Sequence, residues 1–227
     1  MLCVWSVQSS AWEAHDDDCV LPYLSASEHH QLAKRTHPTK HREYLRSRFF
    51  MRYALANTQE AGCSNDWRTL RLYDEGKGPS LPECDVYLSL SHTRSGWMAL
   101  AISDQPVGID IEAHRSGIRV KERLEMILSD DEIAALTPDA LKDERFSYRQ
   151  WCSKESEFKW ASHKSAVETE SVICPPHTSV WQREGYWLAV TAREAPHPTI
   201  RHINAFSKGV AMFNDEFRAA QPRWQPS

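Results

Sequence analysis

The stretch that decides the fold is Val107-Gly-Ile-Asp-Ile-Glu112, in which apolar residues alternate with carboxylates. Successive side chains of an extended strand point to opposite faces of it. The alternation therefore predicts a strand with Asp110 and Glu112 side by side on one face and the apolar residues on the other. Read alone, this pattern is also typical of an edge strand with a solvated face.

A second stretch, Trp151-Cys-Ser-Lys-Glu-Ser-Glu-Phe-Lys159, has helical spacing. Residues four apart share one side of a helix, so Glu155 and Lys159 project in the same direction. Such pairs are often surface ion pairs. If the helix packs on the strand, however, three carboxylates meet one lysine. Three carboxylates suit Mg²⁺, which keeps water and phosphate oxygens in its remaining positions, and the combination predicts a site that handles phosphates.

Upstream of the strand lies a third motif, Ser89-Leu-Ser-His-Thr-Arg-Ser-Gly96. The three motifs, in this order, resemble those of the 4′-phosphopantetheinyl transferases, specifically the larger monomeric type that activates carrier domains of peptide and polyketide synthetases. The resemblance covers roughly residues 24 to 165. It departs after Lys159, where relatives often have a glycine-rich turn and this chain has no glycine. That departure concerns the loop that would face the pantetheine arm.

The resemblance implies transfer of 4′-phosphopantetheine from coenzyme A to a serine of an apo acyl or peptidyl carrier protein, with Mg²⁺ and release of 3′,5′-ADP. The metal ligands would be Asp110, Glu112 and Glu155. Glu155, or a metal-bound water beside it, is the candidate base, and Lys159 would polarise the transferred phosphate. Asp110, Glu155 and Lys159 are thus the expected catalytic residues. Lys154 lies about 100° round the helix from Glu155, from where it could contact a phosphate from the side or simply face solvent.

Positive charge is concentrated between Lys34 and Arg52, where seven basic residues and one acid give +6. Because the whole chain carries −4, the remainder carries −10. Arg48 and Arg52 are four apart beside an apolar helix face, and anchored arginines suit phosphates. The resemblance implies that this region and Lys77 hold the 3′-phosphate and pyrophosphate of coenzyme A. A solvated helix face is the alternative for most of these residues.

Ser91 and His92 end a predicted strand, where side chains and a freed backbone amide could meet phosphate oxygens. Neighbouring strand residues point to opposite faces, so the two do not form a nucleophile and base pair. We therefore expect both residues to bind coenzyme A.

The fold class expected is α+β. The resemblance implies two similar α/β subdomains in a pseudo-twofold arrangement, each a small antiparallel sheet with a long helix. Residues 1–108 would bind the 3′-phosphate of coenzyme A, and residues 109–227 would carry the metal site and catalytic helix. Hydrophobic periodicity predicts strands near 2–7, 86–91, 97–102, 107–112, 178–182, 186–191 and 199–206, and helices near 27–33, 42–56, 120–128, 130–136 and 139–161.

Composition is that of a globular protein, with 227 residues, 41% of them hydrophobic, and nine Trp. The start of the chain lacks a secretory signal, and no apolar run approaches the ~18 residues that span a bilayer. We expect a cytoplasmic monomer without membrane contact. The six cysteines form no C-x-x-C pair and are expected to be free thiols. The −10 balance argues against nucleic acid as a partner.

Two other functions are compatible with the same residues. One is a metal-dependent phosphodiesterase or nucleotidyl transferase with water or a nucleotide as acceptor. The other is a non-catalytic module that binds a carrier protein or nucleic acid through the basic region. The complete set of Asp110, Glu112, Glu155 and Lys159 argues against this second alternative. The pathway served, whether fatty-acid, polyketide, lipid or peptide synthesis, is left open.

Overall fold

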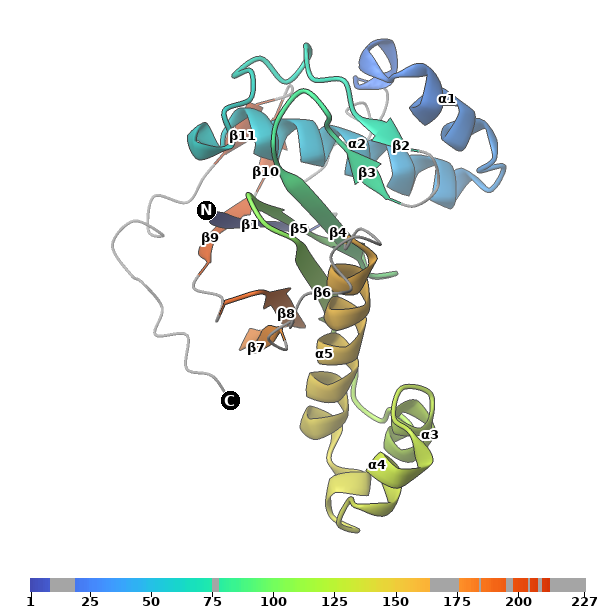
Figure 1. Ribbon diagram of the computed structural model, residues 1–227. Helices are drawn as coiled ribbons and strands as arrows, with labels where there is room; N and C mark the ends of the chain where they lie inside the picture. The colour runs from blue at the N-terminus through green and yellow to red at the C-terminus, as the bar shows by residue number, and fades with distance from the viewer. Residues whose placement is uncertain are drawn as a thin grey trace.

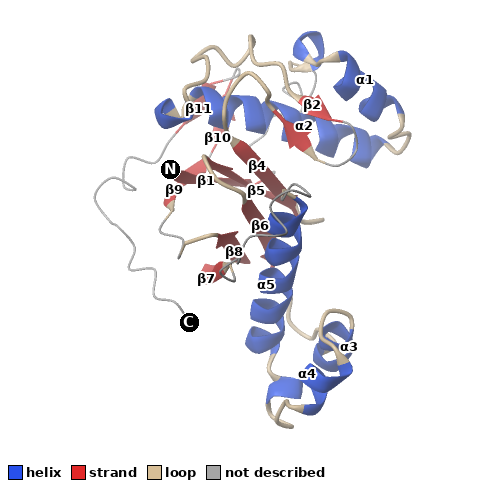
Figure 2. Cartoon of the chain, in the orientation of Figure 1, coloured by secondary structure: helices blue, strands red, loops and turns tan. Residues whose placement is uncertain are grey.

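The computed structural model describes residues 1–8, 19–74, 78–163, 176–183, 185–194, 198–203, 205–207 and 210–212. Five helices and three short 3₁₀ turns lie within these residues (Figure 1, Figure 2). The helices are α1 (Ala26–Ala33), α2 (Pro38–Ala56), α3 (Val120–Glu125), α4 (Asp130–Ala134) and α5 (Glu144–Ser162). The strands are β1 (Leu2–Gln8), β2 (Tyr73–Asp74), β3 (Pro79–Ser80), β4 (Tyr87–His92), β5 (Trp97–Ser103), β6 (Val107–Ala113), β7 (His177–Arg183), β8 (Tyr186–Ala192), β9 (Thr199–Ile203), β10 (Ala205–Ser207) and β11 (Val210–Met212).

Two sheets form the centre of the molecule. One has the strand order β4-β5-β1-β9 and the other β6-β8-β7. All pairs in them are antiparallel except β1 with β9, which is parallel. The 19-residue helix α2 shares a core with the first sheet, and α5, also of 19 residues, packs on the second (Figure 1). The predicted α+β class is confirmed.

Helix α2 begins earlier than the predicted residue 42. His37 is its N-cap, with Nδ1 accepting a hydrogen bond from the amide of Thr39 at 3.3 Å, and Pro38 follows at the first helical position. A proline is well suited there because the amide it lacks would have no partner within the helix. The apolar side of α2, including Phe49 and Phe50, is fully buried against the first sheet.

Helix α5 begins later than the predicted Asp139. Residues Ala140–Lys142 form a separate 3₁₀ turn, and the helix proper starts after Asp143. The Asp143 carboxylate accepts hydrogen bonds from the amides of Arg145 and Phe146, at 2.8 and 3.2 Å. This cap satisfies amides that have no partner within the helix and fixes where α5 begins.

Gly108 of β6 lets α5 approach the sheet at backbone distance. A Cβ atom at this position would lie 1.8 Å from the carbonyl oxygen of Ser156 and 2.7 Å from the amide nitrogen of Trp160. Only a residue without a side chain fits such a contact. The glycine before the Ile-Asp-Ile-Glu run therefore brings the helix directly over Asp110.

The second sheet meets the first at β4 and β6, through side chains rather than a strand ladder. Ser89 Oγ of β4 accepts a hydrogen bond from the amide of Ile109 at 3.1 Å. The expected boundary between residues 108 and 109 falls inside β6, and β9, from the expected second half, is a strand of the first sheet. The pseudo-twofold relationship of the halves stays a prediction.

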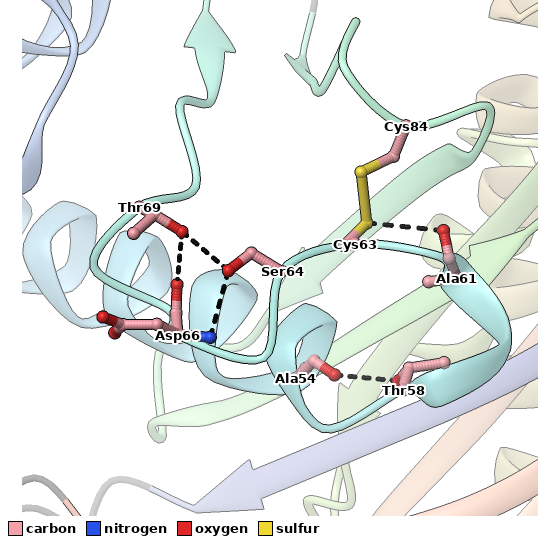
Figure 3. Close-up of a disulfide and its surroundings, with 8 residues drawn as sticks. All are labelled: Ala54, Thr58, Ala61, Cys63, Ser64, Asp66, Thr69 and Cys84. Carbon is pink, nitrogen blue, oxygen red and sulfur yellow. Dashed lines mark hydrogen bonds between the residues drawn. A yellow bond between two sulfur atoms is a disulfide. The ribbon is translucent and has the colours of Figure 1, made fainter.

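The expectation that all cysteines are free is corrected for one pair. Cys63 and Cys84 form a disulfide, with their Cα atoms 5.9 Å apart (Figure 3). Cys3, Cys19 and Cys152 are not part of this disulfide, and Cys174 lies outside the described residues. A pairing 21 residues apart has no C-x-x-C signature, which is why spacing alone did not reveal it.

Among the described residues, no helix combines the length and the apolar character needed to cross a bilayer.

Candidate functional site

Asp110 is the point where β6, β4 and α5 converge. Its side chain is buried, and Oδ1 accepts hydrogen bonds from Ser91 Oγ at 2.8 Å and from Lys159 Nζ at 2.9 Å. Lys159 also donates to the carbonyl of Ile109 at 3.0 Å. The carboxylate is thereby fixed from a strand and from a helix, as the combined motifs predicted.

Glu112, two residues further along β6, is half-buried on the same face. Its nearest cation is Arg123 of α3, with Nη2 3.5 Å from Oε2. Burial raises the pKa of Glu112, the neighbouring Asp110 raises it further, and Arg123 acts against this shift. Two carboxylates thus lie close enough to repel each other, and each has one positively charged partner from a helix.

Glu155 belongs to the side of α5 that faces β6. Cys152, three residues before it, is fully buried, and the pKa of its thiol is raised by burial and then by Asp110 and Glu112. Lys159, four residues after it, contacts Asp110 directly. Since residues three and four apart share a helix face, Glu155 lies between two residues that both adjoin Asp110.

Among the described residues, no three His, Cys, Asp or Glu side chains gather as ligands of a metal ion do. Two observations nevertheless show that Asp110 and Glu112 fit a divalent cation. The second carboxylate oxygen of Asp110, Oδ2, is buried and has no hydrogen-bond partner among the described residues. The raised pKa of Glu112 also reflects negative charge that a hard cation would neutralise.

An open pocket of about 440 Å³ lies beside these carboxylates, at the ends of β4 and β6. Helices α2 and α3 contribute side chains to it. Among the described residues, its charged lining consists of Lys40, Arg94, Arg115, Arg123 and the single acid Glu112, and the titratable side chains of His92 and Tyr148 also line it. An excess of cations in a concave site attracts anions, and phosphates in particular.

Ser91 and His92 take opposite directions from the end of β4, as the strand alternation predicted. Ser91 is buried and donates to Asp110, whereas His92 lines the cationic pocket. Burial lowers the pKa of His92. The structure thus brings both residues to the site, one against the carboxylate and one against the pocket.

Three predicted coenzyme A residues are placed differently from the expectation. Arg52 is fully buried, and its guanidinium donates to both oxygens of Glu28, at 3.0 and 2.5 Å. Arg48 is also buried and forms an ion pair with Asp74. Lys154 forms an ion pair with Glu132 at 2.8 Å on the surface.

The arginine placements do not fit an anion clamp, because the guanidinium groups already have carboxylate partners inside the protein. They fit a network that holds α1 and β2 on α2. Lys77 lies outside the described residues.

The structure also brings to the site residues that the sequence patterns did not single out. Arg123 has its guanidinium carbon 4.4 Å from the ring centroid of Tyr148 and 4.6 Å from that of Trp151. Arg94 and Arg115 follow β4 and β6, respectively, and line the pocket. Tyr148 and Trp151 are three residues apart and so share one helix face, but this spacing alone does not indicate an arginine site.

Comparison with known proteins agrees with the geometry. Residues 106–197 match the family model described as the 4′-phosphopantetheinyl transferase superfamily. No curated protein matches the chain. The matched segment contains β6, α3, α5 and the hairpin of β7 and β8, and so includes Asp110, Glu112, Glu155 and Lys159. Over these residues the chain is therefore similar to the 4′-phosphopantetheinyl transferase superfamily.

Proposed function

We propose that this protein transfers the 4′-phosphopantetheine group of coenzyme A to a serine of an apo carrier protein and releases 3′,5′-ADP. The observation that carries the proposal is the position of Asp110. Within the segment that matches the superfamily, its buried carboxylate is held by Ser91 and Lys159 beside a cationic pocket. This arrangement suits a phosphoanhydride whose charge must be balanced as it breaks.

Binding of coenzyme A would use the pocket rather than the buried arginines of α2. Lys40 and His92 line the pocket from two elements, α2 and the end of β4. Arg94 and Arg115 add two permanent charges. Since 3′-phosphate and pyrophosphate are both anions, a lining of this composition supports binding of either, and Lys77 stays a predicted ligand of the 3′-phosphate.

Mg²⁺ would be held by Asp110, Glu112 and Glu155, and when bound it would neutralise charge on the pyrophosphate. In the transfer, the serine oxygen forms a bond to the phosphorus that carries pantetheine, and the bond from that phosphorus to 3′,5′-ADP breaks. Glu155 would accept the serine proton. Lys159, fixed against Asp110 at 2.9 Å, would stabilise charge on the transferred phosphoryl group.

The partner would be an acyl or peptidyl carrier domain, met by a monomer in the cytoplasm. A diagnostic experiment is incubation of the protein with coenzyme A, Mg²⁺ and a panel of apo carrier domains, followed by intact mass measurement. We expect one carrier to gain the phosphopantetheine mass, with one 3′,5′-ADP released per transfer. The carrier that reacts fastest would indicate the pathway.

The Asp110→Asn variant tests the site behind this activity. It keeps the shape of the side chain but removes the charge that balances Lys159, so the transfer rate should fall by at least about 100-fold. Glu122→Gln is a matched control, because Glu122 is an exposed acid of α3 whose ion pair is with the exposed Arg119. If Asp110→Asn transfers at the wild-type rate, the carboxylate has another role.

A metal-dependent phosphodiesterase is the alternative that the same experiment tests. Hydrolysis of coenzyme A at an equal rate with and without a carrier, and without a mass gain on any carrier, would favour it over the transferase.

A further inference from the structure

The position of Arg123 carries an inference beyond the superfamily motifs. Its side chain is only 17% exposed and lies over the rings of Tyr148 and Trp151, which both belong to α5. Two cation–π contacts together restrict the position of a guanidinium. Arg123 is therefore a fixed group at the wall of the cationic pocket rather than a mobile surface arginine.

The hydrogen-bonding groups of this arginine are incompletely used. Nε and Nη2 are buried, and neither has a hydrogen-bond partner among the described residues. The nearest carboxylate oxygen, Oε2 of Glu112, lies 3.5 Å from Nη2, which is an ion pair without hydrogen-bond geometry. Buried donors without acceptors cost free energy, so an oxygen-rich anion that reaches them would bind favourably.

The charges around Arg123 favour an anionic ligand. Lys40, Arg94 and Arg115 line the same pocket, and Glu112 is the only acid in its lining among the residues that the structure describes. A planar guanidinium with two free N–H directions matches phosphate oxygens better than a single ammonium does. The pairing with Glu112 places the anion next to the carboxylates of β6.

We propose that Arg123 is a pyrophosphate-binding residue, which donates hydrogen bonds from its ring-held guanidinium to the phosphoanhydride of coenzyme A. The inference rests on the proposed function for the identity of the natural ligand. The anion site itself does not, because it follows from the unpartnered donors and the cationic lining. Assignment to the pyrophosphate rather than the 3′-phosphate follows from the contact of Arg123 with Glu112.

The test is calorimetric binding of inorganic pyrophosphate, coenzyme A and dephospho-coenzyme A without divalent metal. Arg123→Met removes the charge but keeps an unbranched chain against the rings, and Arg123→Lys keeps the charge but loses the planar donors. Arg119→Met is the matched control, since Arg119 precedes the same helix and its side chain is 81% exposed. Thermal unfolding of each variant is measured in parallel.

We expect Arg123→Met to weaken binding of all three ligands at least tenfold, Arg123→Lys to weaken it at least threefold, and Arg119→Met to change it less than twofold. Wild-type affinity for pyrophosphate in Arg123→Met would overturn the proposal, as would a wild type that does not bind pyrophosphate. A loss for coenzyme A but not for dephospho-coenzyme A would assign Arg123 to the 3′-phosphate and overturn it too.

If Arg123→Met does not fold, Arg123→Lys decides, because unchanged affinity in that variant contradicts a role for the planar donors. The result is separable from the proposed function. Loss of pyrophosphate binding in the variant would support the role of Arg123 even if no carrier domain is modified. Transfer to a carrier would support the proposed function even if the Arg123 variants bind pyrophosphate normally.

Discussion

Asp110 and Glu112 are two acids on one strand face, and each is paired with a cation from a helix. Their side-by-side position was predicted from alternation alone, and the structure adds burial and a cation for each: Lys159 for Asp110 and Arg123 for Glu112. The helix stripe predicted that Lys159 faces the strand. It did not predict Arg123, because which loop or helix covers a strand end depends on contacts across the chain.

The raised pKa of Glu112 predicts a dependence of stability on pH. The folded protein binds this proton more tightly than the unfolded chain, whose glutamate has the ordinary value of 4.5. The contribution of Glu112 to the free energy of unfolding is therefore greatest when the carboxyl is protonated. This contribution falls as pH rises from the unfolded-state pKa through the higher pKa of the folded state. Glu112→Gln should abolish this fall.

Urea unfolding of wild type and Glu112→Gln between about pH 4 and pH 8 measures this effect. The variant should gain in free energy of unfolding relative to the wild type as pH rises through the window, and the difference should then level off. Glu122→Gln controls for loss of an exposed acid of α3. A difference that is constant over the whole range would show that the pKa of Glu112 is not raised.

The partners of Arg48 and Arg52 could not be predicted from the local sequence. Helical spacing correctly put both on one side of α2, but their partners Glu28 and Asp74 come from other segments, 24 and 26 residues away from Arg52 and Arg48 respectively. Such partners convert a predicted phosphate clamp into an internal network. No local pattern distinguishes the two, since both require an anchored arginine.

At the scale of elements, the contact between β6 and α5 is the most restrictive in the molecule. Gly108→Ala would place a methyl group 1.8 Å from a backbone oxygen of α5, which cannot move aside as a side chain can. The helix would have to shift, which would displace Glu155 and Lys159. We expect a loss of about 3 kcal/mol or more in the free energy of unfolding, and a loss of transfer activity.

Gly117→Ala is the control for this prediction. Gly117 has a φ of 73° and open space around a would-be Cβ, so alanine there should cost only about 1–2 kcal/mol through backbone strain. Chemical unfolding of both variants gives the comparison. Equal and small losses would mean that α5 does not pack as closely on β6 as the structure has it.

The Cys63–Cys84 disulfide closes the segment that connects α2 to β4 (Figure 3). A cross-link over 21 residues restricts the unfolded chain and should contribute about 3 kcal/mol to stability. The double variant Cys63→Ala/Cys84→Ala should therefore unfold at lower urea concentration than the oxidised wild type, and close to the wild type in reductant. Cys19→Ala, which changes a cysteine outside this disulfide, is the control. No difference between oxidised and reduced wild type would mean that the bond does not form.

Most elements could be predicted from periodicity, because each carries its own pattern of apolar residues. Their ends were less predictable. Helix α5 starts at the Asp143 cap rather than Asp139, since either aspartate can cap a helix and only the packing of the chain selects one. The loop after Lys159, where glycine is missing, extends into residues outside those described, so its expected effect on the pantetheine arm stays a prediction.

At the scale of the whole molecule, the two sheets are not independent units. β9 follows the second sheet in the sequence but pairs in parallel with β1 of the first. Ile203 is fully buried in the first core, and Ser6 Oγ lies 3.0 Å from Nδ1 of His202. A strand near residue 199 was predicted, but its partner at the start of the chain was not, because strand patterns do not identify long-range pairs.

Because β9 pairs with β1, we predict that the stability of the first sheet depends on the C-terminal segment. Truncation after Glu194 removes β9, which exposes the edge of β1 and part of the first core, so the midpoint of thermal unfolding should fall by roughly 10 °C or more. The exposed edge should also promote aggregation. Truncation after Met212 retains β9 and is the matched control. If both truncated proteins unfold at the same temperature, the pairing of β9 with β1 does not contribute to thermal stability. The two sheets would then be separable units, as the expected boundary at residue 108 implies.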